Sequence, residues 1–508
     1  STRDYQAVET AQKLFVLVEM DRSYAQWGSF KTEFTDTELA TYNRTLSGLK
    51  VNFDTVSSTV YGDPKRGFKV FSADSEHRAD HNELYATGGS LFYTRNRNIV
   101  EGSEKIRVEI RDKIQNMTVA SYDLQEGVDY EIHYGEGRIF LTRPLSSVAA
   151  ADTLNSTDIL DGSPVYLIVD YEYDPNSVGA SVANQGIRGY TWMGDHLRIG
   201  ATGVQEKRVG DDYDMVGVDG MLKFGRNTKL TAEYARTINQ QMENSISYDG
   251  GISYADTSPL IGRHTRPQND AYLIRGSSEP LKNLETTGYV QGVNPSFSNG
   301  YMRDQEGFEK YGVGSRYKFT DNLAIRYRFD HSAVVSQLMP LDVTGTQEPY
   351  EANETQTAQL IYDNGKYLGE LEYQYRNLDQ VSDTANLTPD LMNQIPFKSG
   401  VAGKLGYHIN ERLLPYIKVQ TAMGGKNDQQ FGGGVRYEIV NNLFAYLEEM
   451  IGPLGDSTYF GFERQHGNGA RSYANIRSID RGIGDKTLST AIGNSFALTE
   501  KSRMYSER

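Results

Sequence analysis

The sequence predicts an all-β fold: a transmembrane antiparallel β-barrel of about 18 or more strands with a small inserted β-sandwich module. Three observations predict it. Apolar and polar residues alternate through many segments of about ten residues, the length that a tilted strand needs to cross a bilayer. Short polar turns join these segments in pairs, and longer links join one pair to the next. Alternation is informative because successive side chains of a strand point to opposite faces of its sheet.

The alternation is clearest after the short polar turn 320–322. Every second residue there is apolar, and most of the residues between them are charged. We expect the apolar face to contact lipid and the polar face to line the interior of the barrel. The apolar face carries Leu323, Ile325, Tyr327 and Phe329, and the other face carries Ala324, Arg326, Arg328 and Asp330.

Similar segments recur along most of the chain. We count about fifteen strands between residues 187 and 498 and two or three more before residue 75. A soluble all-β protein such as a propeller or a solenoid is the alternative, but the sequence has no fixed-period repeat. The early strands are expected in 14–27, 41–53 and 59–72, and clear later ones in 216–224, 313–319, 367–376, 401–409 and 431–439.

The lengths of the connections also alternate. In bacterial barrels the periplasmic turns are short and the extracellular loops are long. We therefore expect the links 241–306, 336–353 and 380–397 to be extracellular loops. Residues 503–508 look like the start of a further strand, so we expect the strand series to continue beyond them. The short turns fall near 226–227, 321–322, 364–365, 410–411, 441–442, 467–468 and 500–501.

Residues 85–176 differ from the rest of the chain. Residues 105–111 alternate, and two short β-prone segments flank Gly135-Glu136-Gly137, which is a hairpin signal. We interpret this region as the inserted β-sandwich module. The expected organisation is therefore first barrel strands in 1–84, the module in 85–176 and the remaining barrel in 177–508.

Part of the module region resembles a module of known proteins. Residues 127–134 (GVDYEIHY) and 137–145 (GRIFLTRPL), with the preceding 102–107, resemble a module of large outer-membrane proteins of Gram-negative bacteria. The same phrase is also similar to segments of gliding-motility and secretion translocon barrels. The resemblance implies a bacterial outer-membrane location and a barrel architecture. It implies no catalytic residues.

The composition excludes several functions. The net charge of −15 argues against nucleic acid as a partner, because phosphate binding needs a basic surface. The absence of Cys excludes disulfides and thiolate metal sites. Neither the G-x-S-x-G nor the H-E-x-x-H motif occurs, so we expect no enzyme, no metal and no cofactor. The 35 Tyr suit strands and membrane interfaces.

The polar face of the strands is the candidate functional feature. A pore or channel-like scaffold is the first hypothesis, because charged residues on an interior wall tune selectivity. The alternatives are the barrel of a protein-secretion or assembly complex and a sheath for a partner such as an electron-transfer cytochrome. The expected partners are outer-membrane lipid and lipopolysaccharide, with a possible protein partner at the extracellular loops or in the lumen. The candidate lining residues are Arg326, Arg328, Glu370, Glu372, Arg376, Lys404, Arg436 and Glu438.

Overall fold

The computed structural model contains one long curved β-sheet and two smaller sheets. Among the residues that it describes, no helix is long and apolar enough to cross a membrane. The described residues are 16–507 apart from 76, 112–117, 146–147, 150–153, 155–162, 176–181, 208–211, 226, 239–242, 257–268, 295, 300–306, 335–350, 381–398, 425–428, 454, 466–470, 481–485 and 500–501.

The long sheet, called the wall below, contains 22 strands among the described residues. Every neighbouring pair is antiparallel and almost every strand pairs with the next one in the chain, except that β4 pairs with β13 and β16 with β19. The wall strands are β1 (Val16–Met20), β2 (Ser23–Lys31), β3 (Thr45–Asp54), β4 (Arg66–Ser75), β13 (Val182–Met193), β14 (Leu197–Glu206), β15 (Tyr213–Phe224), β16 (Thr228–Ile238), β19 (Asp270–Leu281), β20 (Leu284–Val293), β21 (Phe308–Thr320), β22 (Leu323–Val334), β23 (Glu351–Asp363), β24 (Tyr367–Gln380), β25 (Ser399–Tyr407), β26 (Leu413–Gly424), β27 (Gln430–Val440), β28 (Leu443–Gly452), β29 (Gly455–Gln465), β30 (Arg471–Asp480), β31 (Lys486–Thr499) and β32 (Ser502–Glu507).

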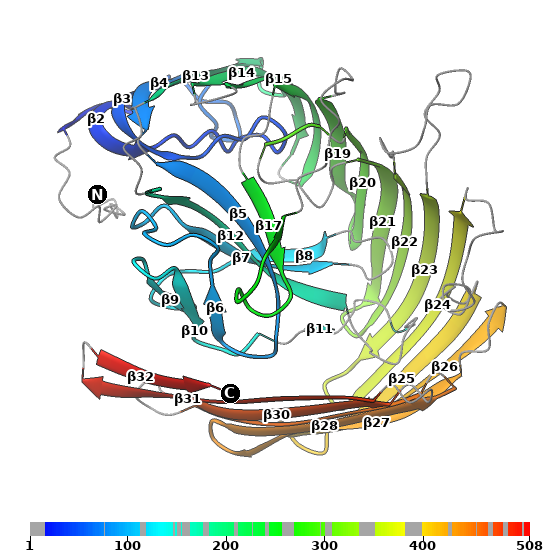
Figure 1. The fold of residues 1–508 in the computed structure, drawn as a ribbon. Coiled ribbons are helices and arrows are strands. Elements are labelled where there is room, and N and C mark those ends of the chain that lie inside the picture. The colour runs from blue at the N-terminus through cyan, green and yellow to red at the C-terminus, as the bar shows by residue number, and fades with distance from the viewer. Residues whose placement is uncertain are drawn as a thin grey trace, which may run out of the picture.

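The wall confirms the predicted all-β antiparallel barrel architecture. It curves around the inserted module, which lies on its concave side (Figure 1). The two edges are β1 and β32: among the described residues, β1 pairs only with β2 and β32 only with β31.

Two of the early strands differ from the sequence prediction. The segment 14–27 is not one strand but the hairpin β1–β2, which turns at Asp21 with a φ of 54°. Asp tolerates this left-handed conformation better than most residues. The turn therefore needs no glycine, and the sequence gives no glycine signal for the end of the first strand. The segment 59–72 contributes only its second half, because β4 begins at Arg66.

The module is a sandwich of two sheets, as predicted. A buried apolar core lies between them and includes Leu84, Val108, Ile139 and Leu167. The larger sheet has the strand order β18-β17-β5-β12-β7-β8, with β11 also paired to β12, and the smaller has the order β6-β10-β9. The module strands are β5 (Arg78–Tyr85), β6 (Leu91–Tyr93), β7 (Lys105–Arg111), β8 (Thr118–Asp123), β9 (Tyr130–His133), β10 (Arg138–Leu141), β11 (Val148–Ala149), β12 (Ser163–Tyr173), β17 (Glu243–Ser247) and β18 (Ala255–Asp256).

The module begins earlier than expected, because β5 starts at Arg78 and belongs to the module rather than to the wall. Its sequence RADHNELY gives little apolar signal. The reason is that its buried face carries Asp80, which accepts a hydrogen bond from the Tyr171 hydroxyl, and Asn82, whose side-chain amide donates to the Ser245 hydroxyl. Buried polar groups of this kind do not show as an apolar stripe in the sequence.

The link 241–306 is not a continuous loop. It contributes β17 and β18 to the module sheet and the hairpin β19–β20 to the wall. Pro280 lies in this hairpin, at a register shift between Ser278 and Leu281, where a proline is tolerated. Of the other two expected loops, 351–353 and 380 lie in β23 and β24, and 336–350 and 381–397 lie outside the described residues.

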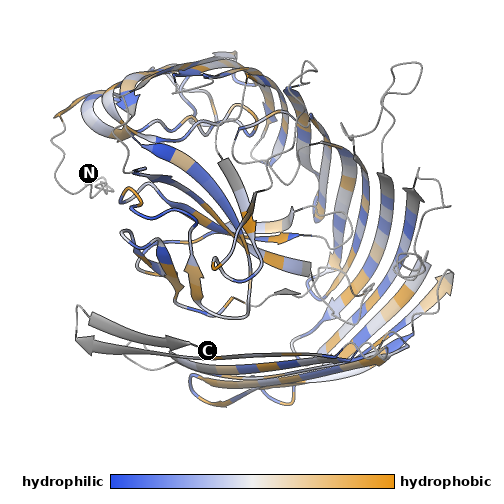
Figure 2. Cartoon of the chain, in the orientation of Figure 1, coloured by the Kyte–Doolittle hydropathy of each residue, from blue (hydrophilic) through white to orange (hydrophobic). Residues whose placement is uncertain are grey.

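The two faces of the wall differ in the way that the alternation predicts. Val218 on the convex face is 57% exposed, whereas the next residue, Asp219, is 8% exposed and faces inward. Hydrophobic and hydrophilic residues alternate along the same strands over much of the wall (Figure 2). The wall therefore presents an apolar outside and a largely polar inside.

Candidate functional site

The eight candidate lining residues all lie on strands of the wall. They alternate along their strands with outward apolar residues such as Tyr327, Leu371 and Leu405. The backbone N–H of Leu154, which belongs to the inserted module, donates a hydrogen bond to the Glu372 Oε2 atom over 2.6 Å. Because the module lies on the concave side of the wall (Figure 1), this contact places Glu372 on the inner face. Arg326 and Arg328 lie on β22, Glu370, Glu372 and Arg376 on β24, Lys404 on β25, and Arg436 and Glu438 on β27.

The structure brings several of these residues together across strands. The Arg326 Nη1 atom lies 3.4 Å from the Gln359 Oε1 atom, and Gln359 donates through Nε2 to Glu372 over 2.7 Å. Glu370 stands directly opposite Lys404 in the register. These contacts form polar rows that run across the wall rather than one compact catalytic cluster.

The remaining lining residues make separate contacts. Arg328 pairs with Asp330, which also accepts a 2.7 Å hydrogen bond from the Tyr289 hydroxyl. Arg436 lies over the Phe444 ring at 5.5 Å, and Glu438 accepts a 3.2 Å hydrogen bond from the backbone of the 441–442 turn. Arg436 and Glu438 therefore lie near the end of the wall that carries the short turns. Arg376 is buried on the same inner face as Glu372.

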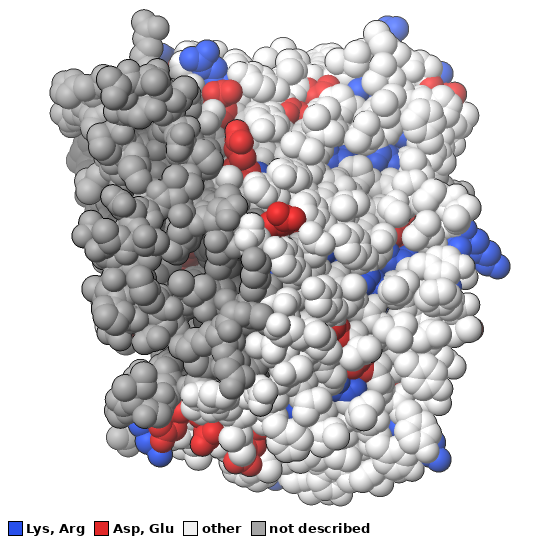
Figure 3. Space-filling model, turned by 90° about the vertical axis from the view of Figure 1, so that its right-hand side faces the viewer, with Lys and Arg blue, Asp and Glu red and all other residues white. Residues whose placement is uncertain are grey.

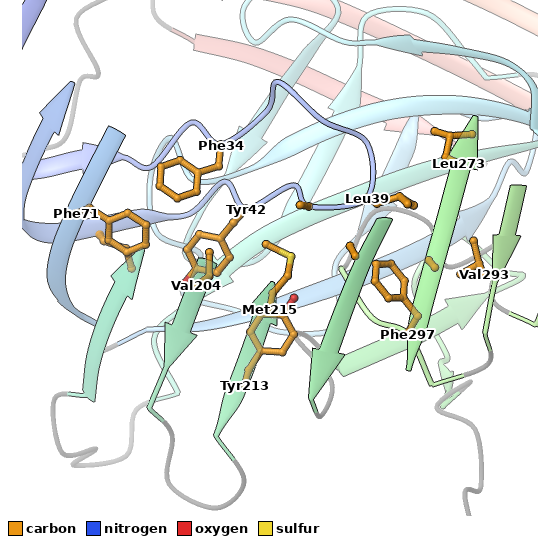
Figure 4. Packing of buried hydrophobic residues seen from close by; sticks show 14 of the residues in the cluster. Phe34, Leu39, Tyr42, Phe71, Val204, Tyr213, Met215, Leu273, Val293 and Phe297 are labelled. Carbon is orange, nitrogen blue, oxygen red and sulfur yellow. The ribbon is translucent and has the colours of Figure 1, made fainter. Parts of the chain in front are cut away.

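Part of the interior is packed with apolar side chains from two connections. The segment 32–44 between β2 and β3 contributes Phe34, Leu39 and Tyr42, and Phe297 follows β20 (Figure 4). The packing is close: a Cβ atom at Gly217 of β15 would lie 2.6 Å from that of Ala40. The facing wall residues include Phe71, Val204, Tyr213, Met215, Leu273 and Val293.

A buried ionic cluster joins this segment to the module and to the wall. The Arg44 guanidinium lies 2.6 Å from Glu206 of β14 and 3.2 Å from Glu172 of β12, and these side chains are only 3–5% exposed. The Tyr42 hydroxyl donates to Glu206 over 3.0 Å, and the backbone N–H of Thr45 donates to Glu172 over 2.8 Å. The three charged groups belong to three separate parts of the chain, so the cluster ties the module to the wall.

The face of the module sheet that points away from its core is also charged and buried. His81 of β5 contacts Asp170 of β12 at 2.5 Å, and Arg107 of β7 reaches the other oxygen of the same carboxylate. Burial alone would lower the pKa of the His81 imidazole, but Asp170 and then Glu83 outweigh it and raise the pKa to about 9. The network continues through Glu109 and Arg111, whose ion pair spans 2.7 Å.

These anchoring groups were not predicted from the sequence. Arg44 is separated from Glu172 by 128 residues and from Glu206 by 162, so no local spacing reveals the cluster. Among the described residues no group of three or more His, Asp or Glu could hold a metal ion. What the interior offers chemically is a polar surface and a set of buried ionic anchors.

The raised pKa of His81 predicts a pH dependence of stability. The folded state holds the His81 proton up to about pH 9, whereas the ordinary pKa is 6.5, so this contribution is complete below pH 6.5 and is lost as the pH rises. Burial lowers the pKa of Lys105 to about 8. The loss of the Lys105 proton has the opposite effect on the free energy of unfolding, and it is only half complete at pH 8. Between pH 6.5 and 8 we expect the free energy of unfolding to fall by about 1–2 kcal/mol more in the native chain than in His81→Gln. Urea unfolding at several pH values measures this, and equal slopes for both chains would contradict it.

Comparisons with known proteins give only distant similarity. No family model and no curated protein matches the chain. Among solved structures, a bacterial polysaccharide outer membrane secretin is 8% identical with a TM-score of 0.25, over 61% of this chain and 88% of that chain. The translocation pore of the P pilus usher PapC is 7% identical with a TM-score of 0.30, over 95% and 79%. The copper transporter OprC is 9% identical with a TM-score of 0.32, over 92% and 83%.

These values are too low to carry a functional conclusion. The strand pairing and the two faces of the wall define the fold without them: an antiparallel, barrel-type sheet with an inserted β-sandwich on its concave side.

Proposed function

We propose that the chain forms a bacterial outer-membrane β-barrel channel whose interior is occupied by its own module. The observation that carries the proposal is the contrast between the faces of the wall: large apolar residues are exposed outside, and charged residues such as Glu206, Glu372 and Arg376 are buried inside. A soluble protein rarely exposes a contiguous apolar surface of this kind. A membrane barrel requires one.

The outer surface supports a lipid environment. Uncharged side chains cover most of the face of the strands on the right-hand side of Figure 1 (Figure 3). The strands from β13 onward are mostly 9–14 residues long, which matches the length needed to cross a bilayer at a tilt. Outer-membrane lipid and lipopolysaccharide are therefore the partners that we propose for this face.

The interior favours a plugged channel over a sheath for a cytochrome. The chain's own module lies where a separate partner would have to fit (Figure 1). The eight lining residues, from Arg326 to Glu438, are proposed to line whatever passage opens between wall and module. A protein-secretion or assembly barrel uses the same architecture, and its substrate would have to displace the module first.

The orientation follows from the connections. The turns after β1, β13, β15, β19, β21 and β27 all fall at one end of the wall, and the module and the link 239–269 arise from the other end. Because periplasmic turns are short in this class, the module enters from the extracellular side. With no native Cys, a cysteine at Lys207 should react with an impermeant maleimide on intact cells and one at Asp321 should not. The reverse labelling would invert the orientation.

Conductance in planar bilayers tests the channel. The native chain should insert and stay mostly closed, because the module occupies the lumen. Replacing residues 76–181 by a short glycine-serine turn keeps the wall intact, since Ser75 and Val182 are already paired neighbours. This variant should give large, steady currents. If the native chain conducts as strongly as the deletion variant, the module is not a plug.

A further inference from the structure

An apolar hollow interrupts the outer face of the wall across β23 to β26. Its volume is about 440 Å³. Tyr362, Gly369, Leu405 and Ile417 stand opposite one another in register on these four strands and line it, together with Tyr407. Because glycine has no side chain, Gly369 leaves the gap between its larger neighbours.

The cationic side chain of Lys366 lies at the rim of this hollow. Lys366 belongs to the turn between β23 and β24, and its Nζ atom lies 5.8 Å from the centre of the Tyr367 ring and 5.9 Å from that of Tyr407. These two rings, which both line the hollow, have centres 5.3 Å apart. Asp363, the last residue of β23, lies on the inner side of the sheet by register, because Tyr362 lies on the outer side.

From this juxtaposition we infer that the hollow binds one anionic glycerophospholipid, with an acyl chain along the strands and the phosphate at Lys366. The inference rests on the proposed membrane location. The site lies at the short-turn end of the wall, which is the end assigned to the periplasm, so a lipid of the periplasmic leaflet would reach it. Tyrosines at the boundary between apolar and polar zones suit this position, since one end of each ring is apolar and the other is wet.

Two substitutions separate the parts of the site. Lys366→Ala removes the charge and leaves the hollow. Gly369→Leu fills the hollow and leaves the charge, and it is sterically tolerable because a Cβ atom there would be 3.8 Å from its nearest neighbour, a Leu405 methyl group. Matched controls are Lys282→Ala, in another exposed turn at the same end, and Gly288→Leu, on the outer face of β20.

The test is native mass spectrometry of the full chain released from nanodiscs that contain phosphatidylglycerol and phosphatidylcholine with identical acyl chains. We expect the native chain to retain one phosphatidylglycerol with about fivefold preference, the discrimination expected of one basic side chain at a membrane surface. Lys366→Ala should lose the preference, Gly369→Leu should lose both lipids, and the two controls should behave like the native chain.

Insertion is measured separately, by protection of the wall from protease in the same nanodiscs. If the chain fails to insert, the proposed function fails and the lipid site with it. If the chain inserts but shows no preference between the lipids, or if Lys282→Ala reduces retention as much as Lys366→Ala, the lipid site alone is overturned.

Discussion

Val218→Arg is expected to destabilise the inserted protein by about 2–4 kcal/mol, the cost of an arginine at the lipid-facing midplane of a barrel. Val218 is the central outward residue of β15 and is 57% exposed. Its cross-strand neighbours are Ala201 and Tyr234, so no carboxylate stands beside it to pair with the new guanidinium. Equilibrium unfolding by guanidinium chloride in lipid vesicles measures the effect.

Phe224→Arg is the matched control. Phe224 lies on the same outward face of β15, at its short-turn end, and is 55% exposed, almost as much as Val218. Near the interface an arginine can reach water and costs only about 0–1 kcal/mol. A lipid environment therefore predicts a clear difference between two positions of equal exposure. If both substitutions cost less than about 0.5 kcal/mol, as on an ordinary protein surface, the outer face is in water and the proposed membrane location is wrong.

Strand β15 also illustrates how much of the fold could be predicted from the sequence. Val216 and Val218 alternate with Gly217 and Asp219, and period-2 alternation is a property of one strand, so the two faces of the wall were predictable from local sequence. Some of the strands that were not predicted pair with partners that are distant in the sequence. For example, β17 takes its place in the module sheet by parallel pairing with β5, more than 150 residues earlier in the chain.

The candidate site was also predictable only in part. The side on which Glu372 lies could be predicted, because it alternates with Leu371 and Tyr373. Its contact with Leu154 could not, because the sequence of a polar stretch does not say which wall strand it reaches. The anchors Arg44 and Glu172 were unpredictable for a further reason: in the sequence, a buried charge looks like an ordinary surface charge until its partner is known.

Arg44→Met should open the channel, and it tests the anchor of the module directly. The substitution keeps a long side chain but leaves Glu172 and Glu206 buried without the guanidinium that they share. Removing one partner of a buried ionic group costs about 3–5 kcal/mol, since the remaining charge stays out of water. The simplest relief for the two carboxylates is for the module to move away from the wall. We therefore expect frequent long openings in planar bilayers, where the native chain is mostly closed.

Two further variants show whether the anchor or general damage causes the opening. Arg138→Met removes a partly exposed ion pair with Glu136, 3.3 Å long and within the module, and should cost at most about 1 kcal/mol and leave the channel closed. Combining Arg44→Met with Glu172→Gln and Glu206→Gln neutralises the whole cluster and should restore most of the closed state, because no buried charge remains to be relieved. Openings that persist in the triple variant would mean that the attraction of the Arg44 charge holds the module in the native chain, and that the cost of unpaired carboxylates does not cause the opening. A closed channel in Arg44→Met would mean that the apolar packing of segment 32–44 is sufficient to hold it.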